Sequence, residues 1–292
     1  MNYIVYQAYG KTEILHECLY SLSTLWPYIL NSDLKVIVYT DQPDWFRQQI
    51  GEESSVLFFP ITAEKIQQWR GKIDFVHRVK IAVLLDISER VSGNLLYVDT
   101  DTTFMASPEL LFDTIESQKR IMHTQEDILE KSKLLLNKKI YNHIRGKTFN
   151  VPSGQLHIKG NLGMWNAGVL GFQTADKKLL IRVLDITDLL YKEYPKHTIE
   201  QLAFSVVFQE NGYIFPAENI LFHYWNFKEF REVLAVFWQK NEEKTWEQKC
   251  SLAQNIRPEK LIQHKISFEQ KPYWIRKLRK WFGIKLKLPI SQ

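Results

Sequence analysis

The feature of the sequence that most limits the possible folds is an alternation of short apolar runs with longer segments of helical spacing. Short apolar runs indicate buried strands, and apolar residues three or four positions apart indicate amphipathic helices. In the first third of the chain this pattern predicts strands at 3–8, 34–40, 56–59 and 95–98, and helices at 12–26 and 75–87. Because strands and helices alternate, we expect an α/β fold with a mostly parallel mixed sheet flanked by helices.

The pattern continues less regularly toward the C-terminus. Residues 109–148 look helical, polar and basic, which predicts an excursion over the sheet. Beyond them we expect strands at 155–158, 167–172, 213–215 and 220–224, helices at 177–191 and 199–209, and the end of the core near residue 224. A length of 292 residues suits one large domain with an appendage. The sequence therefore predicts a main domain at 1–265 and a C-terminal tail at 266–292.

Several features predict a cytoplasmic location. The two cysteines, Cys18 and Cys250, are too few for a disulfide framework or a cysteine zinc site, which fits a reducing compartment. The N-terminal sequence MNYIVYQAYG lacks the basic region and apolar core of a signal peptide. No apolar run in the sequence is long enough to span a bilayer.

Positive charge is concentrated at the C-terminal end. Of the net charge of +5, residues 271–292 contribute +7, so the first 270 residues carry 5 − 7 = −2. Nucleic-acid-binding domains are usually basic themselves, so no nucleic-acid partner is expected. Helical spacing places large apolar residues of the tail on one face: Trp274, Ile275, Leu278, Trp281 and Phe282. This pattern predicts attachment to an anionic membrane surface, on the inner face, with docking of the helix on the main domain as the alternative.

The most informative motif is LLYVDTDTTF, in which an apolar strand ends in Asp99, Thr100 and Asp101. Residues i and i+2 of an extended chain point to the same side, so both carboxylates can reach one point at the carboxyl end of a strand, where open α/β sheets place ligands. Two facing carboxylates repel each other unless a cation lies between them. The motif therefore predicts a site for Mn2+ or Mg2+.

Two other kinds of protein share part of this motif. An EF-hand loop starting at Asp99 would need Gly and Glu where this sequence has Phe104 and Leu110, which excludes it. Haloacid dehalogenase-like phosphatases also begin with D-x-D-x-T after an apolar strand, but they need a later strand that ends in an acidic pair. The later carboxylates Asp185 and Asp188 lie in a helical pattern. Such a phosphatase, or another metal-dependent phosphate-ester enzyme, is kept as an alternative.

Further candidates lie in three segments of the second half. In WNAGVLGF, Asn166 offers a donor and an acceptor to sugar hydroxyls, and the glycines allow close approach of a backbone. In NILFHYWNFK, His223 could be a third metal ligand and Lys228 could meet a phosphate. Glu200 and Gln201 could hold a sugar or an acceptor. Each also has a structural explanation: a tightly packed strand, a histidine bound to backbone, a surface lysine, and a glutamate that favours a helix N-terminus.

Two segments of the first half add donor-binding candidates. Arg78 and Lys80 lie at the start of the helix before the D-x-D strand, where they could contact donor phosphates or ribose. Ala8 and Tyr9 end the first strand, where a nucleotide base could stack on Tyr9. Solvated positions on a helix and an ordinary turn after a strand explain these residues equally well.

Together these segments resemble the nucleotide-sugar glycosyltransferases of the GT-A fold, and are closest to glycosyltransferase family 8. LYVDTD is similar to the metal-binding signature of that family, WNAGVLGF to its segment of sugar contacts, and Glu200-Gln201 to its Asp-Gln pair. His223 stands where the family has a C-terminal metal-binding histidine. The sequence departs from the family in placing Lys228 one position early and in lacking an Asp beside Ala8.

The resemblance implies a hexosyltransferase that moves a sugar from a nucleotide diphosphate, UDP in that family, to a hydroxyl of a glycan or lipid-linked acceptor. It implies Mn2+ or Mg2+ bound by Asp99, Asp101 and His223. Sugar and acceptor would be oriented by Asn166, Glu200 and Gln201. The donor would be bound by Ala8, Tyr9, Arg78, Asp99, Thr100, Asp101 and Lys228. A non-catalytic sugar-binding protein of the same fold is the third alternative.

Overall fold

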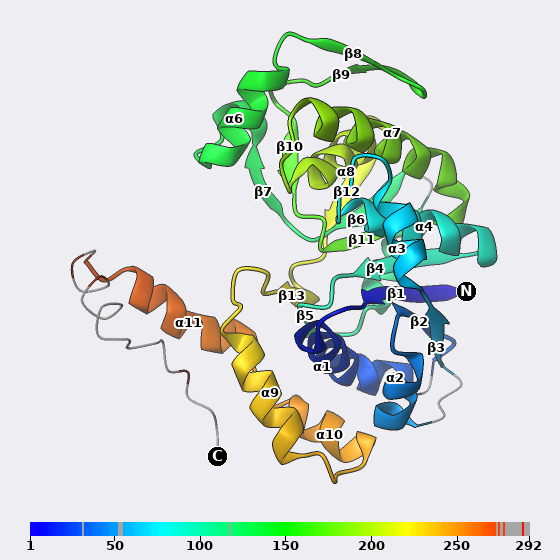
Figure 1. Cartoon of the computed structure of the whole chain (residues 1–292), viewed down its shortest axis with the longest axis vertical. Coiled ribbons are helices and arrows are strands. Elements are labelled where there is room, and N and C mark those ends of the chain that lie inside the picture. The colour runs from blue at the N-terminus through cyan, green and yellow to red at the C-terminus, as the bar shows by residue number, and fades with distance from the viewer. Residues whose placement is uncertain are drawn as a thin grey trace.

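The computed structural model describes residues 1–30, 32–51, 55–116 and 118–272, together with residues 274, 277 and 288. In this part of the chain the central sheet has seven strands (Figure 1). Their order across the sheet is β12 (Tyr213–Pro216), β6 (Lys119–Met122), β11 (Val169–Gln173), β4 (Asn94–Val98), β1 (Asn2–Ala8), β2 (Lys35–Thr40) and β3 (Val56–Pro60). Strand β11 is antiparallel to both of its neighbours, and the other adjacent pairs are parallel. The predicted α/β fold with a mostly parallel mixed sheet is confirmed.

Helices cover both faces of the sheet (Figure 1). Consecutive strand residues point to opposite faces, so in β1 Ile4 and Tyr6 belong to one hydrophobic core and Tyr3 and Val5 to the other. The first core is closed by α1 (Thr12–Ile29), α2 (Pro43–Ile50), α9 (Phe230–Lys240) and α10 (Trp246–Ala253). The second core is closed by α3 (Ala63–Arg70), α4 (Arg78–Arg90), α7 (Lys177–Glu193) and α8 (Ile199–Glu210).

Most of the elements predicted before residue 100 agree with the structure, but the helix expected at 75–87 begins later, as α4. Gly71 and Asp74 have φ values of 67° and 50°, which an α-helix does not accept. Residues 71–77 therefore form turns, and Arg78 is the first helical residue.

The prediction of a helical excursion at 109–148 is wrong in the middle of that segment. Helices α5 (Glu109–Thr114) and α6 (Leu135–Ile144) flank the sheet strand β6, the strand β7 (Gln125–Ile128) and a short 3-10 helix, η1 (Leu129–Lys131). Strand β6 pairs with β11 and β12, whose residues come much later in the chain. Its extended form is therefore set by distant partners, which the local spacing of apolar residues does not reveal.

Beyond α6 the predicted strands and helices are found, with small shifts at their ends. A hairpin of β8 (Thr148–Val151) and β9 (Gly154–His157) lies at the top of Figure 1, and β10 (Gly163–Trp165) pairs with β7. A further short helix, η2 (Thr174–Asp176), leads into α7. A separate antiparallel pair joins β5 (Thr102–Phe104) to β13 (Leu221–His223).

The expectation that the core ends near residue 224 is wrong. Helices α9 and α10 pack in the same core as α1 and bury large side chains: Phe230, Leu234, Trp238 and Trp246. Helix α11 (Pro258–Glu269) follows them. The amphipathic helix predicted at 271–292 lies almost entirely outside the described residues. Within the described residues, no helix combines the length and the apolar character needed to cross a bilayer.

Candidate active site

The pairing of β5 with β13 brings two distant parts of the chain together. Asp99 follows β4, and the hydroxyl of Thr102 donates to the Asp99 carbonyl oxygen at 2.9 Å, which closes a turn into β5. His223 lies opposite Thr102 in the ladder, and the backbone N–H of Tyr224 donates to the carbonyl oxygen of Asp101 at 2.9 Å. Backbone hydrogen bonds therefore place His223 beside Asp101.

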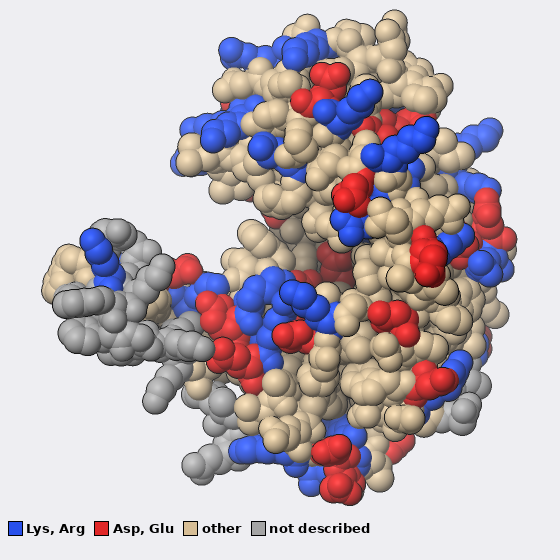
Figure 2. Space-filling model, in the orientation of Figure 1, with Lys and Arg blue, Asp and Glu red and all other residues tan. Residues whose placement is uncertain are grey.

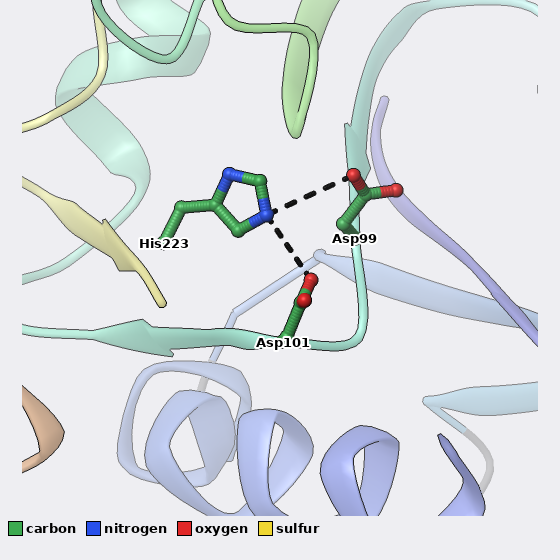
Figure 3. Close-up of side chains that lie close together, drawn as sticks. All are labelled: Asp99, Asp101 and His223. Carbon is green, nitrogen blue, oxygen red and sulfur yellow. Dashed lines mark hydrogen bonds and ion pairs between the residues drawn. The ribbon is translucent and has the colours of Figure 1, made fainter. Parts of the chain in front are cut away.

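The side chains of Asp99, Asp101 and His223 point toward one another (Figure 3). One ligand atom from each lies within 4.8 Å of the others. Nε2 of His223 is 3.1 Å from Oδ1 of Asp101 and 3.9 Å from Oδ2 of Asp99. The structure thus gathers the three residues that the sequence singled out as metal ligands, at the carboxyl edge of β4.

A hydrogen bond to the side-chain oxygen of Asn166 requires that Nδ1 of His223 carries a proton. Oδ1 of Asn166 accepts from the backbone N–H of Gly168 at 2.9 Å and lies 2.9 Å from Nδ1 of His223. An oxygen that already faces an N–H is an acceptor, so Nδ1 must be the donor. In the neutral ring Nε2 then carries the lone pair that faces the two carboxylates.

The cluster has the donor set of a divalent metal site. Burial alone would raise the pKa of Asp101, but His223 and Lys228 hold this pKa well below its usual range; Nζ of Lys228 lies 2.8 Å from Oδ2. Two carboxylates and an imidazole lone pair repel one another unless Nε2 is protonated or a cation lies between them. Carboxylate oxygens with one imidazole accept Mn2+, and oxygen ligands accept Mg2+. The residues present therefore fit either ion.

Lys80 connects the metal cluster to Glu200. Its Nζ lies 3.2 Å from Oδ2 of Asp99 and 3.1 Å from Oε1 of Glu200, and it donates to the carbonyl oxygen of Ala167 at 2.9 Å. Burial alone would lower the pKa of Lys80, but the two carboxylates raise it above its ordinary value. The hydroxyl of Tyr97 donates to the other oxygen of Asp99 at 2.8 Å. Asp99 is thereby held in one orientation before any ligand binds.

Arg78 and Ala8 are the two predicted site residues that do not border the cavity described below. The guanidinium of Arg78 binds Asp188 of α7 through Nε at 2.7 Å and Nη2 at 3.1 Å, and donates to the carbonyl oxygen of Trp69. The side chain of Ala8 is fully buried in the core. Arg78 and Lys80 are two residues apart on α4, which places them about 200° apart around the helix, so the side chain of Arg78 faces α7 when that of Lys80 faces the cluster.

The cluster borders a cavity of about 990 Å³, at the upper end of the range for small-molecule sites. Figure 2 shows the molecule hollowed between its upper and lower parts, with acidic side chains deep in the hollow. The predicted site residues that line the cavity are Tyr9, Asp99, Thr100, Asp101, Asn166, Glu200, Gln201, His223 and Lys228. Nine of the eleven predicted site residues therefore border one cavity.

Glu126 is a residue of this site that the sequence did not indicate. It belongs to β7, lines the cavity and accepts hydrogen bonds from the side-chain amides of Asn166 and Gln201, each at 2.8 Å. The segment around Glu126 was expected to be helical, and a lone glutamate in a polar stretch carries no signal. Only the pairing of β7 with β10 brings it to Asn166.

His123 should make the stability of the protein depend on pH. Burial, together with the nearby His223, lowers the pKa of His123 to about 4, and its Nε2 donates to the carbonyl oxygen of Leu221 at 3.1 Å. Between pH 6.5 and 4 the unfolded chain therefore binds a proton that the folded chain does not, so stability falls as pH falls, by about 3 kcal/mol in total. Urea unfolding at a series of pH values should show this loss. It should be smaller in His123→Gln, and an unchanged pH slope would contradict the assignment.

Comparison with solved structures identifies the fold. The chain matches the crystal structure of the galactosyltransferase LgtC in complex with donor and acceptor sugar analogues, with a TM-score of 0.50 and 14% identity over 74% of each chain. The fold is GT-A. A structure of an active-site mutant of LgtC, with glutamine replaced by glutamate, matches with a TM-score of 0.47 and 14% identity over 71% of this chain and 70% of that one. No protein-family model matches the sequence, and no curated protein does.

Proposed function

We propose that the protein is a metal-dependent hexosyltransferase that moves a sugar from a nucleotide diphosphate sugar to a hydroxyl of an acceptor. The observation that carries the proposal is the convergence of Asp99, Asp101 and His223 on a large cavity at the carboxyl edge of a GT-A sheet. LgtC, which has the same fold, was solved with donor and acceptor sugar analogues, which supports the same type of reaction here.

Asp99, Asp101 and His223 would hold Mn2+ or Mg2+ at this edge. Such an ion, when bound, supplies positive charge against the diphosphate leaving group. The ammonium group of Lys228 is paired with Asp101 but half of its side chain is exposed, so it can turn to a phosphate oxygen. A phosphate contact by Arg78 stays a prediction, since it would require the pair with Asp188 to open.

The donor base would lie at the end of β1. The side-chain oxygen of Gln7 is buried and has no hydrogen-bond partner among the described residues, and Gln7 lines the cavity beside Tyr9. A buried acceptor without a partner is costly, so its position favours a ligand that offers an N–H, as uracil does. Tyr9 would stack on the base, with Thr100 nearby and Ala8 contributing only backbone atoms. These observations support UDP as the nucleotide.

The remaining polar residues would orient the sugar and the acceptor hydroxyl. Asn166, Glu200 and Gln201 are largely buried but line the cavity, so their side chains are fixed before a ligand arrives. Positioning of this kind lowers the entropic part of the barrier. The buried pair of Lys80 and Glu200 keeps the carboxylate of Glu200 in place.

The acceptor is proposed to be a glycan that carries an apolar group, such as a lipid-linked sugar. In the described part of the chain, four large apolar side chains that line the cavity are 47% to 75% exposed: Val76, Leu134, Leu135 and Trp225. Apolar side chains gathered in this way around a polar site mark a surface that binds an apolar partner. The basic residues of 271–292 agree with a cytoplasmic enzyme at the inner face of an anionic membrane.

The phosphatase alternative has less support. It needs a second acidic pair after a later strand, whereas Asp185 and Asp188 lie within α7. Asp188 also forms an ion pair with Arg78, so its carboxylate is not directed to the D-x-D carboxylates. Hydrolysis of a generic phosphate ester that depends on Asp99 would restore this alternative.

Calorimetric titration with UDP, with and without Mn2+, tests the proposal. The wild-type protein is expected to bind UDP at least about tenfold more tightly with Mn2+, because Asp99, Asp101 and His223 would hold the ion and it would supply positive charge against the diphosphate. Asp101→Asn, which keeps the size of the side chain, should lose this enhancement. Equal binding with and without Mn2+ would contradict metal-dependent donor binding, and absence of binding in both conditions would rule out UDP as the donor nucleotide.

The apolar rim gives a separate prediction. With methyl and hexyl glycosides of the same acceptor sugar, Leu135→Ser should raise KM for the hexyl glycoside about fivefold, because about 1 kcal/mol of apolar contact is lost. KM for the methyl glycoside should stay the same. Leu110→Ser is the matched control, since Leu110 is 54% exposed but lies on α5 and not on the cavity. Equal changes in KM for the two glycosides would show that Leu135 does not contact the hexyl group, and would contradict an acceptor with an apolar group.

A further inference from the structure

Glu126 holds two amide side chains of the cavity with a single carboxylate. Oε1 accepts from Nδ2 of Asn166 and Oε2 accepts from Nε2 of Gln201, both at 2.8 Å. The backbone keeps these groups in register, because the N–H of Asn166 donates to the carbonyl oxygen of Thr124 at 2.8 Å and β7 pairs with β10. The carboxylate is therefore fixed between the loop after β10, which carries Asn166, and the helix α8, which carries Gln201.

A carboxylate contact fixes which way the amide of Asn166 faces. A carboxylate only accepts hydrogen bonds, so the atom of Asn166 that faces Glu126 must be the nitrogen. The opposite atom faces the backbone N–H of Gly168, so it must be the oxygen. Two independent contacts thus agree on one orientation, and the alternative orientation would put donor against donor at Gly168 and acceptor against acceptor at Glu126.

The orientation of the Asn166 amide in turn fixes the Nδ1 proton of His223, the proposed metal ligand. The Asn166 oxygen accepts from Nδ1, so Nε2, which faces Asp99 and Asp101, is the nitrogen that can give up its proton to a metal. A metal ligand needs this tautomer, and groups that fix the tautomer of a ligating histidine contribute to metal affinity. If Asn166 turned over, its amide nitrogen would face Nδ1 and favour the proton on Nε2, where it blocks a metal.

We propose that Glu126 is a positioning residue that fixes the tautomer of His223 through Asn166 and, with its other oxygen, the orientation of Gln201. The metal site and the glutamine that faces the sugar are then coupled through one carboxylate. With its nitrogen bound to Glu126, Gln201 has its carbonyl oxygen to offer to a ligand hydroxyl. The inference rests on the proposed function in two respects: that His223 is a metal ligand and that Gln201 faces the sugar.

A pair of substitutions tests the chain of contacts. Glu126→Gln keeps the size of the side chain but has one acceptor for two amides, and Asn166→Asp sets one carboxylate against another. In the double variant, the amide nitrogen at position 126 can donate to the carboxylate at position 166, while the amide oxygen still accepts from Gln201. The carboxylate at 166 can then accept from both Nδ1 of His223 and the N–H of Gly168. Each single change leaves one contact of residue 126, with residue 166 or with Gln201, without a matching donor and acceptor. The double change gives both contacts a matching donor and acceptor.

Mn2+ affinity of the full chain, measured by electron paramagnetic resonance of free Mn2+, is the first measurement. Each single variant should bind Mn2+ about 10- to 100-fold more weakly than wild type, as expected for groups that orient a metal ligand. The double variant should recover at least about tenfold over either single variant, which a role in folding alone would not produce. Additive losses in the double variant, or wild-type affinity in Glu126→Gln, would overturn the proposal.

The tautomer itself is the second measurement. In metal-free protein with nitrogen-15 labelled histidine, the His223 ring of the wild type should show a protonated Nδ1 that is hydrogen-bonded to Asn166, and Glu126→Gln should lose this proton from Nδ1. A His223→Gln sample assigns the signals. The nitrogen-15 spectrum of His223 does not require bound metal. If the wild type fails to bind Mn2+, the proposed metal site is wrong, but the spectrum still tests the role of Glu126. An unchanged His223 spectrum in Glu126→Gln would overturn it.

Glu218→Gln is the matched control for both measurements. The Glu218 carboxylate accepts a hydrogen bond from the hydroxyl of Thr124, close to Glu126 in the chain, but it does not line the cavity. This variant should keep the Mn2+ affinity and the His223 spectrum of wild type. A loss equal to that of Glu126→Gln would show that any carboxylate removed from this region has the same effect, and would count against the proposal.

Discussion

The Gly168→Ala variant is expected to lose most of its affinity for divalent metal. A Cβ at residue 168 would lie 2.2 Å from both Nδ1 and Cε1 of His223 and 3.0 Å from Oδ1 of Asn166. Contacts of 2.2 Å do not occur, so the imidazole ring would have to move away from Asp99 and Asp101. A metal site that loses the orientation of one ligand loses affinity about 10- to 100-fold. Mn2+ titration of the folded variant measures this loss.

Gly171→Ala is the control that separates the site from the core. A Cβ at residue 171 would meet Ile121 at 2.6 Å, between β11 and β6 and away from the metal cluster. Overpacking of this kind typically costs about 1–3 kcal/mol of stability. The folded fraction of Gly171→Ala should nevertheless bind Mn2+ as wild type does. Normal Mn2+ affinity in Gly168→Ala would mean that His223 is not a ligand.

Lys80→Met is expected to lower the free energy of unfolding by about 3–5 kcal/mol, because it leaves Asp99 and Glu200 without their shared cation. Lys80 and Glu200 are both almost fully buried, so water cannot replace the lost partner. Methionine fills a similar volume, which keeps the change electrostatic. Urea unfolding at neutral pH measures the effect.

Lys228→Met provides the comparison for that prediction. Lys228 also pairs with a carboxylate of the cluster, at 2.8 Å from Asp101, but its side chain is 52% exposed. Pairs near solvent contribute about 1 kcal/mol or less, so this variant should unfold at nearly the same urea concentration as wild type. Similar losses in the two variants would show that burial of Lys80 does not determine its contribution.

The first half of the fold and most of the residues that border the candidate site could be predicted because their signals are local. Strand β4 and the D-x-D carboxylates follow one another in the chain, so period and spacing alone place Asp99 and Asp101 at a strand end. His223 could be named because it ends an apolar run. The amides of Asn166 and Gln201 stood in segments similar to those of a known family.

The rest depends on partners that local spacing does not contain. Strand β6 is extended because β11 and β12 pair with it, and Glu126 enters the site because β7 pairs with β10. The choice between Arg78 and Lys80 depended on which side of α4 packs against α7, where Asp188 binds Arg78. Helices α9 and α10 follow the last predicted strand and could be placed only by the apolar surface of α1 that they cover.

The hydrogen bond between Asp101 and His223 joins residues that are 122 positions apart in the chain. Closing a loop of that length costs about 4 kcal/mol of chain entropy. The helices and strands between residues 101 and 223 must therefore supply at least that much stabilisation when they pack. During synthesis, a nascent chain that has not yet reached β13 already carries both carboxylates but has no third ligand to offer a metal. If the proposed metal site is correct, it is complete only after β13 has paired with β5, so acquisition of metal would mark a chain whose sheet has already been assembled.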